Sequence, residues 1–138
     1  MIGYKQIFYV LGLLLILMGM AMLIPASVDI IYNNKDWEVF VLSSAIAIFL
    51  GGLMSIPTRD VGENLNKREL LILIPLAWIT MPSIATLPIY TSELGLSFTD
   101  AYFESLSGMT TTGATILSNL DNAPPGICLL YTSDAADD

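Results

Sequence analysis

The sequence predicts an all-α membrane protein, in which a hairpin of two transmembrane helices precedes a third span and a short helix that re-enters the membrane. Three observations lead to this fold class. The chain has 138 residues, of which 54% are hydrophobic, and the excess lies in three long uncharged runs and not in periodic apolar faces. A fourth segment is too short and too acidic to span a bilayer. It ends in a stretch rich in threonine and glycine.

The first two uncharged runs, residues 7–24 and 39–56, are predicted to be membrane spans. Each is close to the about 20 helical residues that cross a bilayer core of ~30 Å. The first run has an alternative reading as a cleaved signal peptide, but it exceeds the about 7–15 apolar residues of a typical signal core. The polar segment 32–36 joins the two runs into a hairpin, and Tyr32 and Trp37 flank it as interfacial aromatic residues do.

Small residues in both runs favour helix packing over exposure to lipid. Gly12 and Gly19 are about two helical turns apart, a spacing that lets a second helix approach closely, although such glycines are often merely tolerated in lipid. The second run is rich in small side chains, which predicts burial against neighbouring helices. These are Ser43, Ser44, Ala45, Ala47, Gly51 and Gly52.

Residues 58–69 are the only stretch dense in charges of both signs, and they precede the third predicted span at 70–90. Three of the five basic residues (Arg59, Lys67 and Arg68) lie in this loop and Lys5 lies at the N-terminus, against Lys35 alone in the intervening turn. By the positive-inside rule, the N-terminus and this loop are cytoplasmic. Kinks are expected in the third span, which three prolines interrupt. They are Pro75, Pro82 and Pro88.

The segment 97–109 is predicted to be a half-membrane helix. Ser97 and Asp100 match a capping pattern in which a hydroxyl at the helix start pairs with an acid three residues on. The helix of about ten residues would be ~15 Å long, about half the bilayer core. Asp100 and Glu104 are four residues apart and so share one face near the helix N-terminus, where the dipole favours acids. A charged half-helix must be surrounded by protein and not by lipid.

The six residues 110–115 are predicted to turn back as extended backbone and to form a cation site. A helix gathers partial negative charge at its C-terminus, where unpaired carbonyls point outward. Carbonyl and hydroxyl oxygens can replace the water around an ion, and a glycine adopts backbone angles that other residues resist. On these six residues alone, an ordinary polar turn after an amphipathic helix is the favoured interpretation. The cation site is favoured by position, because the segment follows three runs of membrane length and is itself too short and too acidic to be a fourth.

Charge and composition exclude several classes of function. The chain has no histidine and a single cysteine, Cys128, so disulfide frameworks, His/Cys metal sites and Ser-His or Cys-His nucleophile pairs are excluded. No enzyme is expected, although Asp100 and Glu104 could in principle act as a carboxylate pair. Residues 70–127 contain no Lys or Arg, which leaves an acidic vestibule on the outer side that concentrates cations. The acids of this vestibule are Glu93, Asp100, Glu104 and Asp121. Nucleic acid is not expected as a partner. A small membrane scaffold or anchor subunit with a purely structural Thr/Gly turn is the alternative function.

The last eleven residues, CLLYTSDAADD at 128–138, break with the rest of the chain. They resemble the translation of a sequencing-library transposase adapter, and a short disordered acidic tail is the alternative. On the adapter interpretation the tail is not native. The natural sequence then reaches about Ile127, and the chain is a fragment open at its C-terminus.

The stretch DAYFESLSGMTTTGATIL, with LPIY before it and NLDNAP after it, resembles the first pore loop of the Trk/Ktr/HKT superfamily of potassium transporters. It is most similar to the bacterial TrkH/TrkG branch. The resemblance extends back through WIT and SIATLP in the third span and, more weakly, through the N-terminal hairpin. It covers nearly all of residues 1–127.

This resemblance implies four concatenated span, pore-loop and span repeats around one pore, as in the four subunits of a potassium channel. Residues 1–57 would be an extra N-terminal hairpin, and residues 58–127 an incomplete first repeat with its pore helix and filter loop. The resemblance implies potassium uptake across the bacterial plasma (inner) membrane. It also implies a homodimer, embedded in membrane lipid, with a cytosolic nucleotide-binding regulatory subunit.

Carried over residue by residue, the potassium contacts fall on Thr111, Thr112 and Gly113, largely through backbone oxygens, with Thr110 as their neighbour. Gly113 matches the filter glycine that the family associates with potassium. Some plant relatives have serine at that place and favour sodium.

Overall fold

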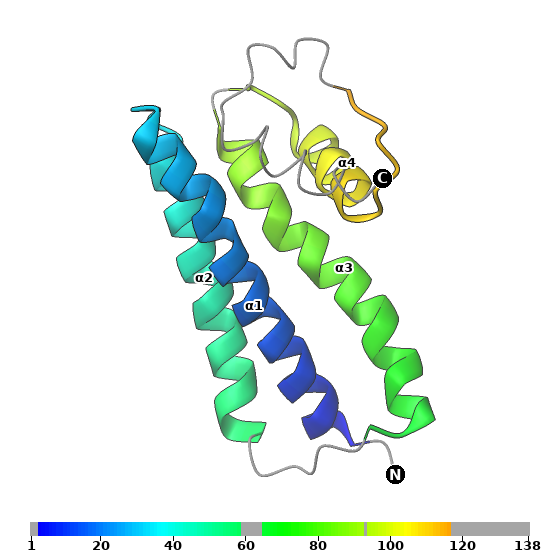
Figure 1. The fold of residues 1–138 in the computed structure, drawn as a ribbon. Coiled ribbons are helices and arrows are strands. Elements are labelled where there is room, and N and C mark those ends of the chain that lie inside the picture. The colour runs from blue at the N-terminus through cyan, green and yellow to red at the C-terminus, as the bar shows by residue number, and fades with distance from the viewer. Residues whose placement is uncertain (1–2, 59–64, 93, 117–138) are drawn as a thin grey trace.

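The computed structural model describes residues 3–58, 65–92 and 94–116, which form four α-helices (Figure 1). Helix α1 spans Tyr4–Ile31, α2 spans Trp37–Ser55, α3 spans Lys67–Thr91 and α4 spans Phe98–Met109. A short 3-10 helix, Ile56–Thr58, continues α2. No strand occurs in these ranges, and the predicted all-α fold class is confirmed.

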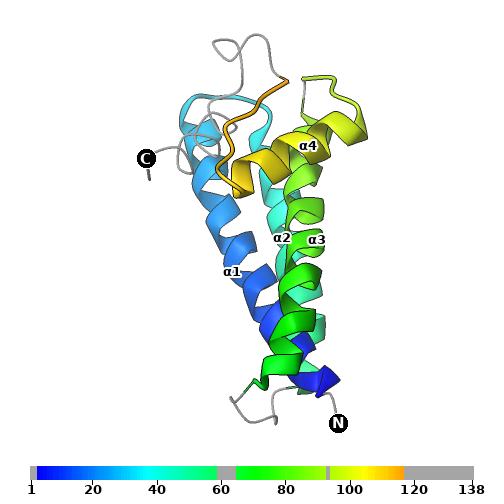
Figure 2. The same cartoon turned by 90° about the vertical axis from the view of Figure 1, so that its right-hand side faces the viewer.

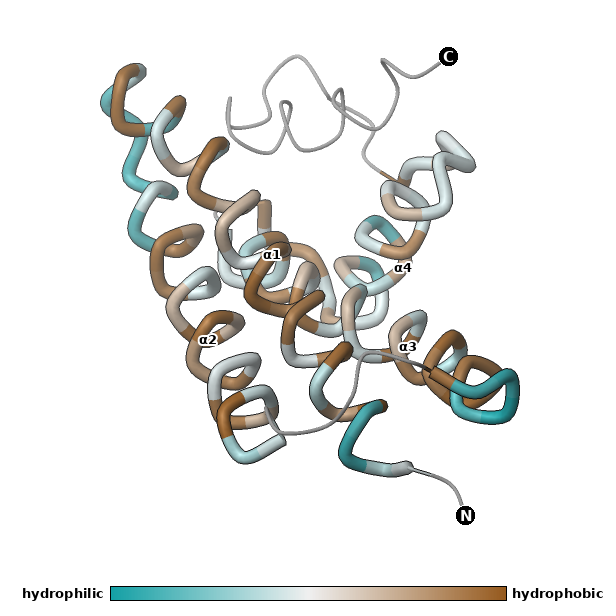
Figure 3. The backbone as a smooth tube through the Cα atoms, turned by 60° about the horizontal axis from the view of Figure 1, so that its bottom comes forward, coloured by the Kyte–Doolittle hydropathy of each residue, from teal (hydrophilic) through white to brown (hydrophobic). Residues whose placement is uncertain are grey.

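Three of the four helices are long and apolar enough to cross a membrane: α1, α2 with its 3-10 continuation, and α3. Colouring by hydropathy shows long apolar stretches on these helices and a paler, more polar α4 (Figure 3). The predicted first span was too short, because α1 runs on through Pro25 and Asp29 before it ends at Ile31. Asp29 is fully buried in the protein, so its charge does not end the helix.

Helices α1 and α2 pack against each other more extensively than any other pair, and glycine is the reason that they approach so closely. A Cβ atom placed on Gly12 would lie 2.6 Å from the carbonyl oxygen of Gly51, and one on Gly51 would lie 2.5 Å from the carbonyl oxygen of Gly12. About two helical turns farther along the same interface, the Ser44 hydroxyl donates to the Gly19 carbonyl at 2.7 Å. Gly12, Gly19, Ser44 and Gly51 therefore form the close contact between the helices. The predicted burial does not extend to Ala45, which is exposed, or to Gly52, which has open space beside it.

Helix α3 begins at a capping box made by Asn66 and Glu69. The Glu69 carboxylate accepts hydrogen bonds from the Asn66 amide at 2.9 Å and, across the fold, from the Gly3 amide at 2.8 Å. Just beyond this contact, Ile7, Leu11 and Leu73 form a buried apolar cluster between α1 and α3. One helix runs through all three prolines, and kinks at these positions stay a prediction.

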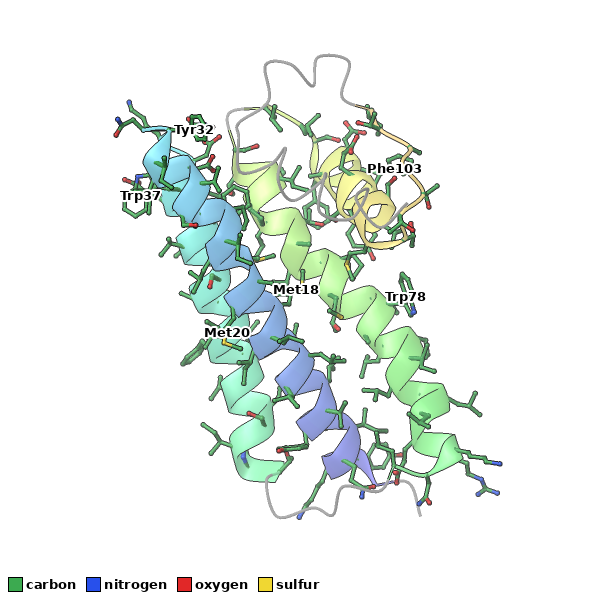
Figure 4. The ribbon with its side chains drawn as sticks, in the orientation of Figure 1. Met18, Met20, Tyr32, Trp37, Trp78 and Phe103 are labelled. Atoms are coloured by element: carbon green, nitrogen blue, oxygen red, sulfur yellow. The ribbon has the colours of Figure 1, made fainter. Side chains whose placement is uncertain are left out.

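The starts of α1 and α3 lie at one end of the molecule, and the segment between α1 and α2 lies at the opposite end with α4 (Figure 1). Tyr32 and Trp37 both lie at that second end, and Trp78 projects from α3 away from the hairpin (Figure 4). Since Lys5, Lys67 and Arg68 belong to the helix starts and Lys35 to the connecting segment, the two ends differ in basic charge as the sequence suggested.

Candidate functional site

The short helix α4 begins as its sequence predicts. Ser97 is the N-cap residue, and its side-chain oxygen accepts a hydrogen bond from the Asp100 amide at 3.2 Å. The same hydroxyl donates to the Asp100 carboxylate at 2.7 Å. The reciprocal pair satisfies one of the amides that a helix start leaves unpaired, so α4 has a fixed beginning. With 12 residues, it is roughly 18 Å long at a rise of 1.5 Å per residue.

Buried hydroxyl groups attach α4 to the flank of α3. The Ser105 hydroxyl lies 2.8 Å from the Thr86 hydroxyl and donates to the Pro82 carbonyl at 3.1 Å. Thr86 donates to the same carbonyl at 2.7 Å, and Ala101, one turn earlier on α4, is fully buried. Pro82 precedes the α3 end at Thr91 by about 14 Å at the helical rise. Helix α4 therefore lies against the side of α3 and crosses the upper part of that helix (Figure 2).

The end of α4 is a Schellman turn built on a threonine. The Thr112 amide donates to the Ser107 carbonyl at 3.1 Å and the Thr111 amide donates to the Gly108 carbonyl at 3.2 Å, which is the bond pair of that motif. Thr111 has a φ of 53°, in the left-handed region where a β-branched residue is strained. Thr110, the C-cap, keeps right-handed angles. The helix is thus stopped by backbone geometry at the first residues of the predicted cation site.

The hydroxyls of the turn also point back to the helix. Thr110 donates to the Leu106 carbonyl at 2.9 Å and lies 2.7 Å from the Thr112 hydroxyl. Thr111 donates to the Thr110 carbonyl at 2.7 Å. The expectation of unpaired carbonyls at the end of α4 was therefore wrong for Leu106, Ser107 and Gly108, whose oxygens all accept hydrogen bonds. They are occupied because the chain turns back at once and supplies donors.

After the turn, the backbone runs back along α4. Gly113 has a φ of 72°, and a Cβ atom there would meet nothing within 4 Å. Ser107 donates to the Ala114 carbonyl at 2.6 Å. Farther along, the Thr115 hydroxyl donates to Glu104 Oε1 at 2.8 Å, and the Ile116 amide donates to the same oxygen. Later residues of the loop thus contact earlier residues of the helix, so residues 114–116 run antiparallel to α4. Residues 112–115 belong to no helix, but the backbone of 110–115 is not extended throughout as predicted, because Thr110 keeps right-handed angles and Thr111 and Gly113 have positive φ.

Glu104 differs from its predicted role in an outward acidic face. Its side chain is only 3% exposed and turned toward the loop, whereas Asp100 is held by Ser97. The two other acids of the predicted vestibule, Glu93 and Asp121, lie outside the described residues, as does the tail 128–138 with Cys128. Sequence reasoning missed the contact of Glu104 with the loop, and the only available signal was a hydroxyl residue following the helix.

The predicted ion contacts lie together on the exposed side of this turn. The structure places Thr110, Thr111, Thr112 and Gly113 consecutively after α4, all exposed. Within residues 3–58, 65–92 and 94–116, no group of three or more acidic residues, histidines or cysteines is arranged to hold a metal ion. A cation at this loop would depend on carbonyl and hydroxyl oxygens, the donors suited to a weakly held alkali ion.

Comparison with known proteins gives one consistent result, although no family model matches the chain. It is 37% identical over 125 residues to the Trk system potassium uptake protein TrkH of Escherichia coli K12, which covers 90% of this chain and 26% of that protein. It is 35% identical over 121 residues to TrkG of the same organism, covering 87% of this chain and 25% of that one.

A solved structure agrees with these relatives. The crystal structure of the potassium transporter TrkH from Vibrio parahaemolyticus matches 94% of this chain and 28% of its own, with a TM-score of 0.87 and 33% identity. The chain thus spans about a quarter of the length of the relatives that it matches. By sequence and by fold, this membrane protein belongs to the family of the Trk system potassium uptake proteins.

Proposed function

We propose that the chain is part of a potassium uptake protein of the bacterial plasma membrane and supplies one of its four selectivity-filter loops. The observation that carries this proposal is the non-helical Thr/Gly turn at the end of α4, a short helix that is attached through Ser105 to the side of α3. Exposed non-helical backbone is tolerated at membrane depth only where protein buries it or where it lines a water-filled path. Relatives named as potassium uptake proteins supply the identity of the ion.

In this proposal potassium is the cargo and contacts mainly main-chain oxygens. The contacts are Thr111, Thr112 and Gly113, with Thr110 beside them. The hydroxyls of Thr110 and Thr111 are already turned to backbone carbonyls, which favours carbonyl oxygens over hydroxyls as the ligands. Rings of such carbonyls replace the hydration shell of potassium in channels.

The membrane orientation follows from charge. The N-terminus and the start of α3 carry most of the basic residues and face the cytoplasm under the positive-inside rule. Helix α4 and its loop then lie toward the outer side. Residues 1–57 form an N-terminal hairpin and residues 58–127 the first, incomplete pore repeat. The complete protein works as a homodimer in lipid with a cytosolic nucleotide-binding regulatory subunit, and it has no enzymatic activity.

The test replaces Gly113 with serine in the full-length gene product, expressed in bacteria that lack their own potassium uptake. We expect Gly113→Ser to lower the preference for potassium over sodium in uptake assays. Gly95→Ser is the matched control, because Gly95 has a similar φ of 64° and equally open space around a Cβ atom, so both variants incur a similar strain of about 1–2 kcal/mol.

The scaffold alternative makes the opposite prediction. If the Thr/Gly turn is purely structural, Gly113→Ser and Gly95→Ser will change folding or assembly to the same degree. Cation flux per molecule will then be the same in both variants. That outcome, with wild-type protein that moves no potassium, would contradict the proposed function.

A further inference from the structure

We propose that Glu104 is a positioning residue that holds the filter loop on its path and thereby sets the discrimination between potassium and sodium. This inference rests on the proposed function for its consequence in transport, but its structural basis is independent of it. The carboxylate of Glu104 and the hydroxyl of Ser107 reach the loop from consecutive turns of one face of α4.

The loop is held on both sides of its ion-contacting residues. On the near side, the Thr111 amide is bonded to the Gly108 carbonyl, and within the segment the Thr112 amide is bonded to the Ser107 carbonyl. On the far side, the Ser107 hydroxyl is bonded to the Ala114 carbonyl at 2.6 Å. Residues 111–113 therefore lie in a short segment that is bonded to Gly108 at its start and to Ser107 within it and just after it. Their carbonyls cannot move far without breaking one of these bonds.

Glu104 secures the continuation of that segment. Its Oε1 atom accepts hydrogen bonds from the Thr115 hydroxyl and the Ile116 amide, so one oxygen fixes a side chain and the adjacent peptide group. Gly113 lies just before this anchored stretch and is the most conformationally free residue of the loop. Without the carboxylate, the stretch after Gly113 would lose both of these bonds to α4.

The contact explains why an ionisable side chain is buried here at all. Glu104 is 3% exposed, and a buried carboxylate in a membrane segment is costly unless donors satisfy it. Since Oε1 already serves two donors from the loop, Glu104 acts on the ion through the backbone path and not as a ligand. Ion discrimination depends on where the oxygens are held, which makes Glu104 a determinant of specificity.

The experiment uses the full-length gene product, purified and reconstituted into lipid vesicles, with wild type and the variants Glu104→Ala and Glu104→Gln. We expect Glu104→Ala to reduce the ratio of potassium to sodium uptake about tenfold, equivalent to 1.4 kcal/mol of differential binding. Glu104→Gln should retain most of the ratio, because its amide oxygen can accept the same two hydrogen bonds. Rescue by glutamine would separate positioning from a requirement for negative charge.

Two buried serines supply a matched pair in case Glu104→Ala fails to fold. Ser107→Ala removes a bond to the loop and should lower the uptake ratio about threefold, or 0.65 kcal/mol. Ser105→Ala removes bonds to α3 and to the Tyr102 carbonyl of its own helix, and none to the loop, so it should lower the amount of folded protein while it leaves the ratio unchanged. Equal ratios in Ser107→Ala and Ser105→Ala would overturn the inference.

Hydrogen exchange separates this inference from the proposed function. The Ile116 amide should exchange at least about tenfold faster in Glu104→Ala than in wild type, since it loses its acceptor. If wild-type protein transports no potassium, the proposed function fails, and the exchange rate alone decides whether Glu104 holds the loop. An unchanged exchange rate, or faster exchange with an unchanged uptake ratio in an active transporter, would overturn the proposal.

Discussion

The α1–α2 hairpin and the α4 loop are held together by different kinds of contact. In the hairpin, glycines bring two backbones together so closely that an added Cβ atom would collide with a carbonyl, and the stabilisation comes from packing. The α4 loop is tied to its helix by hydrogen bonds that involve Ser107 and Glu104, and residues 110–116 are exposed. Packing gives the hairpin its stability, whereas directional bonds give the loop a defined shape.

The largest expected effect tests the packing half of this contrast. Gly51→Ala places a Cβ atom 2.5 Å from the Gly12 carbonyl and 3.0 Å from the Ile16 amide nitrogen, so the backbones must separate. We expect a loss of about 2–3 kcal/mol in unfolding free energy, as overpacking produces, measured by denaturant unfolding in detergent. Gly52→Ala, next to it in open space, should be neutral or stabilising by about 0.5–1 kcal/mol through helix propensity. Equal losses in both variants would mean that the close approach is not what holds the hairpin.

A smaller effect tests the attachment of α4. Thr86→Val keeps the side-chain shape but removes the hydroxyl that bonds to Ser105 and to the Pro82 carbonyl. We expect a loss of about 1–2 kcal/mol, because buried polar groups are left with fewer partners. Protease resistance of the segment after α3 is the measurement. Thr80→Val is the control, since the Thr80 hydroxyl bonds only to carbonyls of its own helix. The attachment would be apolar in origin if both variants resisted proteolysis as wild type does.

The smallest effect concerns the strained threonine. Thr111→Gly should stabilise the turn by about 0.5–1 kcal/mol, because glycine adopts a positive φ without strain. Slower hydrogen exchange of the Thr112 amide, which closes the turn on Ser107, would report this gain. Thr110→Gly is the control: residue 110 already has right-handed angles, so this variant should give no gain. A slower exchange in Thr110→Gly would show that the positive φ of Thr111 carries no strain.

Much of the fold could be predicted from the sequence because the strongest signals were local. Uncharged runs of membrane length gave the three spans, and the Ser97 cap with the TTTG stretch gave the limits of α4 within a residue or two. The prediction fell short at the end of α1, where the uncharged run stops at residue 24 but the helix continues through Asp29 to Ile31. A carboxylate that the fold buries is compatible with a continuing helix, and burial depends on residues distant in the chain.

The candidate site was predictable as a loop but not in its geometry. The positive φ of Gly113 follows from residue type, whereas that of Thr111 does not, since a β-branched residue normally avoids it. The carboxylate of Glu104 was assigned to the vestibule because helix spacing shows which residues share a face and not what that face meets. Its donors lie 11 and 12 residues later, beyond the reach of local patterns. Potassium contact at residues 110–113 stays a prediction.

The clamp between Gly3 and Glu69 makes the beginnings of two helices interdependent. The donor is a main-chain amide, so no side chain can replace it, and a Cβ atom at position 3 would lie 2.7 Å from the accepting oxygen. Deletion of residues 1–3 would therefore remove one hydrogen-bond donor from the Glu69 carboxylate, which also caps α3. A change at the start of α1 would thus loosen the start of a helix that lies more than sixty residues later in the chain.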